Sequence, residues 1–414
     1  MDIDLTPDQK TFRATSKKFL EAETPLTRVR ELAVGPEAFE PAWWARGAEL
    51  GWTAMLGPEE LGGGSISGAG LVDLAIAAEE MGRLVSPGPM AVTNAVITAL
   101  VESVDGPDHS AVLAGLMSGA TVAGWAFYEP GGGLPGVGRP GAGFATTATA
   151  TGDGYRLDGV KDRVEAADQA DILLVTAQTV DGPTQFLVPV DAPGVSIDPS
   201  WSLDIVRRFA QVSFEAVDLP AGAVIGRVGG AGPAIERQLQ VAIVLSCAET
   251  CGAVERVLEF TIAWAFDRYS FGRPLASYQA LKHRFADSKT WLEAMHATTL
   301  GAARAVQGRT SDAARLVSVA KSYVGGRSTD IIQDCVQLHG GIGVTWEHDL
   351  HLFLRRATVN RALYGTPAEH RRRLVDLHLG TEPAATEPVA ESDSPPDSGP
   401  TVAAPAASAA PVPA

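Results

Sequence analysis

Cysteine is scarce in this chain of 414 residues, which contains only Cys247, Cys251 and Cys335. A set that is small and odd in number argues against a disulfide framework and is typical of a reducing compartment. Cys247 and Cys251 lie four residues apart in a stretch with helical periodicity, but no histidine or further cysteine nearby completes a set of metal ligands. We therefore expect buried, small apolar side chains and predict no metal site.

Long apolar runs are also lacking. No stretch of about 18 uninterrupted apolar residues occurs, which argues against a transmembrane helix. The first ten residues contain no basic segment followed by an apolar run, so they do not resemble a secretory signal. We therefore expect a cytoplasmic protein without a membrane partner.

Basic residues are outnumbered, since 33 Lys and Arg stand against 49 Asp and Glu and give a formal net charge of −16. Such a protein repels phosphate backbones, so we expect no nucleic-acid partner. Hydrophobic residues nevertheless make up 45% of the chain. A chain of this length and composition can bury a sizeable core in two or three domains.

The spacing of apolar residues changes along the chain. It is helical in residues 1–120 and 229–380, whereas residues 121–228 hold short alternating runs separated by turns. We predict an α+β fold that is mostly α, with an N-terminal α-helical domain, a middle β-barrel domain and a C-terminal four-helix bundle. Residues 381–414 are rich in Pro and Ala, acidic, and free of basic or aromatic residues, which predicts a disordered tail.

Several elements can be placed more closely. Thr6 followed by Pro7 predicts the cap and first residue of a helix. Four further helices are expected over residues 235–266, 275–306, 311–339 and 367–379. Strands are expected over residues 144–151, 155–159, 172–177, 185–190 and 212–214.

Sequence motifs in all three regions occur in an order typical of one enzyme family. The N-terminal region contains Leu50-Gly51-Trp52, Leu61-Gly62-Gly63-Gly64 and Glu79-Glu80-Met81-Gly82-Arg83. The middle region contains the run from Trp125 to Gly131, and the C-terminal region contains Arg268-Tyr269-Ser270-Phe271-Gly272 and Gln337-Leu338-His339-Gly340-Gly341. Over roughly residues 2–378 the chain therefore resembles the acyl-CoA dehydrogenases.

This resemblance implies a function and a set of ligands. Members of the family remove a proton α to the thioester of an acyl-CoA and transfer a hydride from the β-carbon to N5 of FAD. The reduced flavin then passes its electrons to an electron-transferring flavoprotein. By the resemblance, the residues that contact FAD are Arg268, Phe271, Gln279, Gln337, Gly340, Gly341, Thr366, Phe127 and Tyr128.

The chemistry of these residues suits a dinucleotide. Arg268 offers a fixed fork of donors to a pyrophosphate or a flavin carbonyl. Gly340 and Gly341 remove side chains where a backbone must approach closely, although an ordinary helix C-cap would explain them too. In the middle region, Arg163 and Glu165 stand where the family carries an aromatic residue and a Thr beside the flavin. A glutamate there requires a partner for its charge.

The catalytic base is missing from both positions where the family places it. Tyr364 replaces the glutamate of the aromatic-Glu-Gly-Thr segment, and Ala242 and Ile243 replace the alternative glutamate and the arginine that contacts CoA. Three substitutes can be considered: Glu236, which lies six residues before the alternative position; Tyr364 itself as a phenolate; and Glu249, for which we favour a structural role.

Two main functions follow from the resemblance. The chain is expected to be the base-lacking subunit of a heteromeric α2β2 acyl-CoA dehydrogenase, in which a homologous subunit supplies the base. The alternative is a self-sufficient acyl-CoA dehydrogenase with a relocated base. A non-catalytic paralogue and another flavin-dependent oxidase or monooxygenase remain open. By analogy with actinobacterial relatives, we expect the substrate to be an acyl-CoA whose acyl group is a steroid side chain or another bulky group.

Overall fold

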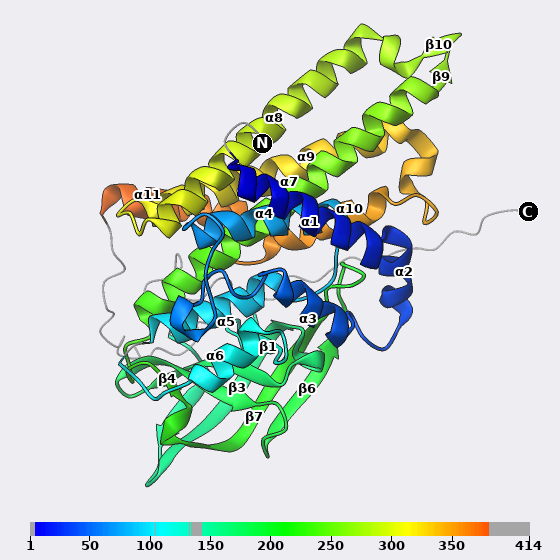
Figure 1. Ribbon diagram of the computed structural model, residues 1–414. Helices are drawn as coiled ribbons and strands as arrows, with labels where there is room; N and C mark the ends of the chain where they lie inside the picture. The colour runs from blue at the N-terminus through cyan, green and yellow to red at the C-terminus, as the bar shows by residue number, and fades with distance from the viewer. Residues whose placement is uncertain (1–4, 104, 132, 134–142, 381–414) are drawn as a thin grey trace, which may run out of the picture.

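The computed structural model describes residues 5–103, 105–131, 133 and 143–380 (Figure 1). The tail predicted over residues 381–414 lies outside these residues. The prediction of a mainly helical fold with a central sheet is confirmed. No helix among the described residues combines the length and apolar character needed to cross a membrane.

The N-terminal region is helical. The first helix begins as predicted, because the Thr6 hydroxyl accepts a hydrogen bond from the Gln9 backbone and the Gln9 side chain accepts one from the Thr6 backbone. The helices here are α1 (Pro7–Glu23), α2 (Leu26–Val34), α3 (Pro41–Glu49), α4 (Gly70–Arg83), α5 (Met90–Glu102) and α6 (Ser110–Met117), with a short 3-10 turn at Glu59–Leu61.

The middle region is a β-sheet. Its strands are β1 (Ala123–Ala126), β2 (Thr147–Ala150), β3 (Gly154–Glu165), β4 (Ile172–Thr179), β5 (Gly182–Pro189), β6 (Val195–Ser200), β7 (Phe209–Pro220) and β8 (Val224–Ile225). They are arranged in the order β6-β7-β3-β2-β4-β5-β8, and β1 pairs in parallel with β4.

Among the residues that the structure describes, the sheet of the middle β-domain does not close into a barrel. The end strands β6 and β8 do not pair with each other. β8 is two residues long, and most of β6 is exposed to solvent. In the middle of the sheet, β2 and β4 meet through one residue pair, Thr147 and Gln178. The sheet therefore consists of two antiparallel parts that are weakly joined, and its ends stay apart.

The C-terminal region forms the predicted bundle and one helix more. The helices are α7 (Gly232–Asp267), α8 (Gln279–Gln307), α9 (Ala313–His339), α10 (Leu350–Ala362) and α11 (Pro367–Leu379). α11 has the predicted bounds, whereas α10 was not predicted. A small hairpin, β9 (Tyr269–Ser270) and β10 (Arg273–Pro274), joins α7 to α8 at the end farthest from the sheet (Figure 1).

One helix links the two kinds of structure. α5 contacts both α7 of the bundle and β1 of the sheet. Its residues from Met90 to Leu100 are buried all round, as expected of a helix enclosed by other elements. This packing brings β1 close to the segment that joins α10 to α11, and the candidate site lies there.

Candidate functional site

The residues predicted to contact FAD separate into two groups within this chain. The inner group is Phe127, Tyr128 and Thr366, and it lies with Tyr364 between the sheet and the start of α11. The outer group is Arg268, Phe271, Gln279, Gln337, Gly340 and Gly341, and it lies where α7 and α9 end and α8 begins. Figure 1 shows the hairpin that carries Phe271 and the strand β1 at opposite ends of α7. Within one chain, the two groups do not form one site.

The inner group is packed into a cluster of aromatic rings. The ring of the buried Tyr364 stacks on Trp125 at 6.1 Å between centroids, and Trp125 stacks on Phe127 at 5.0 Å. The Tyr128 hydroxyl accepts a hydrogen bond from the Tyr364 backbone N–H. The Arg163 guanidinium lies 4.3 Å from the centre of the Tyr128 ring, which is a cation–π contact.

The space left between these side chains is very small. The cavity lined by Trp125, Tyr128, Arg163, Glu165 and Tyr364 has a volume of about 10 Å³. A cavity of that size holds about one water molecule. The inner group therefore does not fit an isoalloxazine ring, because side chains of this chain occupy the space between its members.

The turn that carries Tyr364 has an unusual backbone. Tyr364 has a φ of 57° and Gly365 a φ of 95°. The left-handed conformation costs a residue with a side chain roughly 1–2 kcal/mol. His370 supports the turn, because its Nε2 lies 2.8 Å from the Tyr364 carbonyl oxygen and its Nδ1 lies 3.2 Å from the Ser318 hydroxyl. Since a carbonyl can only accept, Nε2 carries the proton. Burial lowers the pKa of His370 to about 4, so the ring is neutral at neutral pH.

Thr366, predicted to meet the flavin, caps α11 in this chain. Its hydroxyl donates to Glu369 Oε2 at 2.7 Å and accepts from the Glu369 backbone N–H at 3.3 Å. The helix cap accounts for both hydrogen bonds of this hydroxyl.

A network of buried charges lies behind the aromatic cluster. Arg207 pairs with Glu165 at 2.8 Å and with Glu249 at 3.2 Å. Arg356, whose side chain is fully buried, pairs with Glu249 at 2.6 Å and with Asp204. Asn360 donates to Glu249 at 2.7 Å. The partner that sequence reasoning required for Glu165 is therefore Arg207, which comes from the loop before β7.

The environment of Tyr364 and Glu249 explains why neither suits proton abstraction. Burial, reinforced by the charge of Glu165, raises the pKa of the Tyr364 phenol well above its usual value, which disfavours a phenolate. Burial opposes the charge of Glu249, but Arg207 and Arg356 outweigh it and keep its pKa below the ordinary value. Both oxygens of Glu249 bind arginines, so this carboxylate is a structural anion and not a free base.

Glu236 lies elsewhere. Its carboxylate pairs with Arg373 of α11 and accepts a hydrogen bond from Gln240 at 2.8 Å. It lines an open cleft of about 410 Å³ together with Arg237 and Arg309, and Tyr364 is not part of that cleft. Ala242 and Ile243, at the alternative base and CoA positions, are fully buried and carry no polar group.

The outer group has the opposite character. Phe271 is 97% exposed, and Arg268, Gln279, Gln337, Gly340 and Gly341 are exposed as well. The residues after α7 and those at the end of α9 lie at the same end of the bundle. Trp264, one turn before Arg268, stacks on His339 at 5.4 Å between ring centroids. Within the described part of the chain, the side chains of Arg268, Gln279 and Gln337 make no hydrogen bond.

The two glycines of the outer group, Gly340 and Gly341, are explained by different features of the structure. Gly340 has a φ of 66° at the end of α9, so its conformation alone favours glycine. Gly341 has no such conformation, and a Cβ atom added there would meet nothing within 4 Å. Packing among the described residues therefore does not explain the second glycine, whereas the close approach of a ligand would.

Comparisons with known proteins agree with the motifs. A family model described as the N-terminal domain of the acyl-CoA dehydrogenases matches residues 6–119, and one described as their C-terminal domain matches residues 230–376. Acyl-CoA dehydrogenase IpdE2 of Mycobacterium tuberculosis is 30% identical over 375 residues, which cover 89% of this chain and 98% of the relative.

Solved structures give the same result for the fold. A variant of the Tcur3481-Tcur3483 steroid ACAD superposes with a TM-score of 0.79 at 28% identity, over 90% of this chain and 98% of that one. The ChsE4-ChsE5 complex from Mycobacterium tuberculosis superposes with a TM-score of 0.79 at 23% identity, over 93% of this chain and 100% of that one.

Proposed function

The chain belongs to the acyl-CoA dehydrogenase family of flavin oxidoreductases, and from this premise we propose that it is the base-lacking subunit of a heteromeric acyl-CoA dehydrogenase. A homologous partner subunit supplies the catalytic base and the pocket for the acyl thioester and the flavin ring. This chain supplies the surface that receives the adenylate and pyrophosphate of the partner's FAD. FAD, when bound, accepts the hydride.

The observation that carries this proposal is the contrast between the two groups of residues. The inner group has Tyr364 in place of a base, a cavity of about 10 Å³, and a network of buried charges behind it. Opening this cavity to admit a flavin would move Glu165, which lines it, away from Arg207. Breaking one buried ion pair typically costs about 3–5 kcal/mol.

The outer group supports the other half of the proposal. Arg268 presents donors in a geometry that suits phosphate oxygens, and the exposed ring of Phe271 offers a flat apolar surface. Gln279 and Gln337 add amide donors and acceptors. These groups have no partner among the described residues of the chain, so they are available to a ligand that reaches them from another subunit.

The substrate that we propose is a bulky acyl-CoA, with a steroid side chain as the first candidate. The support is the similarity to the solved steroid ACAD whose name combines two proteins, Tcur3481 and Tcur3483. The proposed electron acceptor is an electron-transferring flavoprotein, as the family resemblance implies.

Co-purification tests the proposal. The full chain is produced alone and together with a homologous acyl-CoA dehydrogenase from the same organism that carries the catalytic glutamate, and flavin absorbance is followed as acyl-CoA is added. We expect the lone chain to show no bleaching and the complex to bleach. Bleaching by the lone chain would favour a self-sufficient enzyme with a relocated base. A chain that joins no flavoprotein partner would favour a non-catalytic paralogue.

Substitution in the outer group sharpens this test. Arg268→Ala in the complex is expected to reduce bound flavin while the two chains still co-purify. Arg372→Ala, which changes an exposed arginine on α11, is the matched control and should leave the flavin content unchanged. Equal flavin content in both variants would contradict the proposed role of the outer group.

A further inference from the structure

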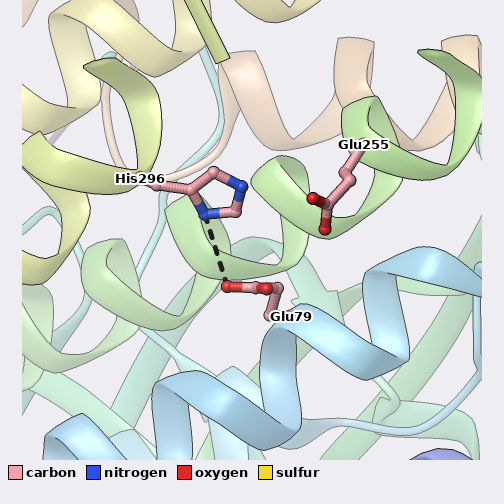
Figure 2. Close-up of side chains that lie close together, drawn as sticks. All are labelled: Glu79, Glu255 and His296. Carbon is pink, nitrogen blue, oxygen red and sulfur yellow. Dashed lines mark ion pairs between the residues drawn. The ribbon is translucent and has the colours of Figure 1, made fainter. Parts of the chain in front are cut away.

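Three helices bring possible metal ligands together on the side of the bundle where α1 and α4 pack. Glu79 comes from α4, Glu255 from α7 and His296 from α8 (Figure 2). One ligand atom from each of the three lies within 4.8 Å of the other two. Neither Tyr364 nor the outer group takes part in this cluster.

The His296 ring is available as a ligand. Its side chain is only 3% exposed, and Nε2 has no hydrogen-bond partner among the described residues. Nδ1 faces Glu79 Oε2 at 3.4 Å (Figure 2). That distance exceeds the ~2.7–3.2 Å of a good N–H···O hydrogen bond. Nδ1 is therefore within ion-pair distance of Glu79, whereas Nε2 is a buried polar atom that the described residues leave unpaired.

The same distance suits two atoms bound to one zinc ion. Imidazole nitrogen and carboxylate oxygen lie about 2.0–2.2 Å from zinc, which places two tetrahedral ligands roughly 3.4 Å apart. The three possible ligand atoms lie within 4.8 Å of one another, so the Glu255 side chain has to move closer to reach that separation.

Arginines hold both carboxylates and leave one oxygen of each for a metal. Arg13 pairs with Glu79 Oε1, while Oε2 faces His296. Arg83 pairs with Glu255 Oε2 at 2.9 Å, while Oε1 has Lys289 at 3.8 Å, which is a loose contact. Groups that orient ligands in this way are typical of metal centres.

A cavity adjoins the cluster. It has a volume of about 50 Å³ and is lined by Glu79 and His296, with Arg13, Cys251 and Thr299 beside them. A cavity of this size holds more than one water molecule, so water can complete the coordination and accept a hydrogen bond from the remaining ring nitrogen.

We propose that Glu79, Glu255 and His296 bind a divalent transition metal, with Zn²⁺ as the ion that this set of nitrogen and oxygen donors suits best. The ion joins α4, α7 and α8, and its role is structural. The sequence predicted no metal site, because its three ligands are far apart in the chain and follow no ligand spacing.

Zinc titration of the full chain, stripped of metal and without a histidine tag, tests the proposal. We expect one zinc ion per chain by equilibrium dialysis. His296→Asn and Glu255→Gln should each weaken zinc binding by at least about tenfold. Asp287→Asn and His283→Asn change exposed residues of α8 and should bind zinc like the original chain.

Thermal melting gives a second readout, because a metal that binds the folded chain raises its melting temperature. Zinc should stabilise the original chain and Asp287→Asn but not the ligand variants. If His296→Asn does not fold, Glu255→Gln carries the test, since the Glu255 side chain is 21% exposed. Zinc binding below one ion per chain, or equal affinity in the original chain and the ligand variants, would overturn the proposal. Neither result depends on flavin or on the partner subunit.

Discussion

The inner and outer groups of predicted FAD contacts carry motifs of the same family and lie in opposite environments. In the inner group, Tyr128, Tyr364 and Thr366 all have partners within the chain, and the surrounding charges are paired and buried. In the outer group, Arg268 and Phe271 extend into solvent. The inner region is therefore packed like a protein core, whereas the outer region is an exposed surface that is available to a ligand or a partner.

The largest expected effect follows from replacing Arg356, which is fully buried between Asp204 and Glu249. Arg356→Met removes the ion-pair partner of the buried Asp204 and leaves Glu249 with Arg207 alone, so it should lower the free energy of unfolding by about 3–5 kcal/mol. Urea denaturation of the purified chain measures this loss. Arg256→Met, at a half-exposed arginine on α7, is the control and should cost less than about 1 kcal/mol. Equal losses in both variants would mean that the inner network is not a core.

Acid should destabilise the turn that carries Tyr364. Burial lowers the pKa of His370 from 6.5 in the unfolded chain to about 4 in the folded chain. The contribution of His370 is therefore fully present above pH 6.5 and is lost as the pH falls from 6.5 to about 4, by up to about 3 kcal/mol. Glu80 acts in the opposite sense, since burial raises its pKa to about 7.

The measurement is therefore a difference between two stability curves. The free energy of unfolding is followed against pH for the original chain and for His370→Gln, in which Glu80 is unchanged. The original chain should lose more stability over this pH range than the variant. Parallel curves would show that His370 is not buried as a neutral ring.

Arg268→Ala should separate stability from cofactor binding. The Arg268 side chain is exposed and makes no hydrogen bond to the described residues, so the free energy of unfolding should change by less than about 0.5 kcal/mol. A hydrogen bond to a charged group contributes about 1.5–3 kcal/mol, so FAD affinity of the complex should fall roughly tenfold or more. Flavin release on dilution measures the affinity, with Arg372→Ala as the control.

The smallest effect is expected for Tyr364→Phe. The contacts of Tyr364 that matter here are its ring stacking on Trp125 and its backbone bonds to Tyr128 and His370, and phenylalanine can keep all of them. Turnover of the complex should stay within about twofold of the original, which corresponds to less than about 0.5 kcal/mol. A loss of several orders of magnitude would make Tyr364 a catalytic residue after all.

Much of the architecture could be predicted from local patterns. The capping box at Thr6 and the helix from Pro367 to Leu379 follow from residues that are neighbours in the sequence. The helix Leu350–Ala362 was missed, because charged residues interrupt its apolar spacing and Arg356 faces the interior. Whether the sheet closes could not be predicted, because closure depends on pairing between segments that are distant in the sequence, and here β8 is two residues long and β6 is mostly exposed.

The candidate site, like the fold, could be predicted only in part. The absence of a glutamate from the two positions where the family carries its base could be predicted at Tyr364 and Ala242, because each stands at a definite distance from a motif. The closure of the pocket could not be read, since Arg207 pairs with Glu165 and Glu249, each 42 positions away, and its own loop has no motif. The adjacent arginines Arg207 and Arg208 were a weak signal of charge in an otherwise apolar region. The Glu79, Glu255 and His296 cluster gave no signal, because three separate helices bring it together.

The number of flavins per complex tests the central claim most directly. The chain is purified together with its homologous partner, and FAD released on denaturation is compared with the amounts of the two chains. We expect one FAD for each pair of unlike chains, and no flavin on this chain when it is purified alone. FAD on both kinds of chain, or on the lone chain, would contradict it.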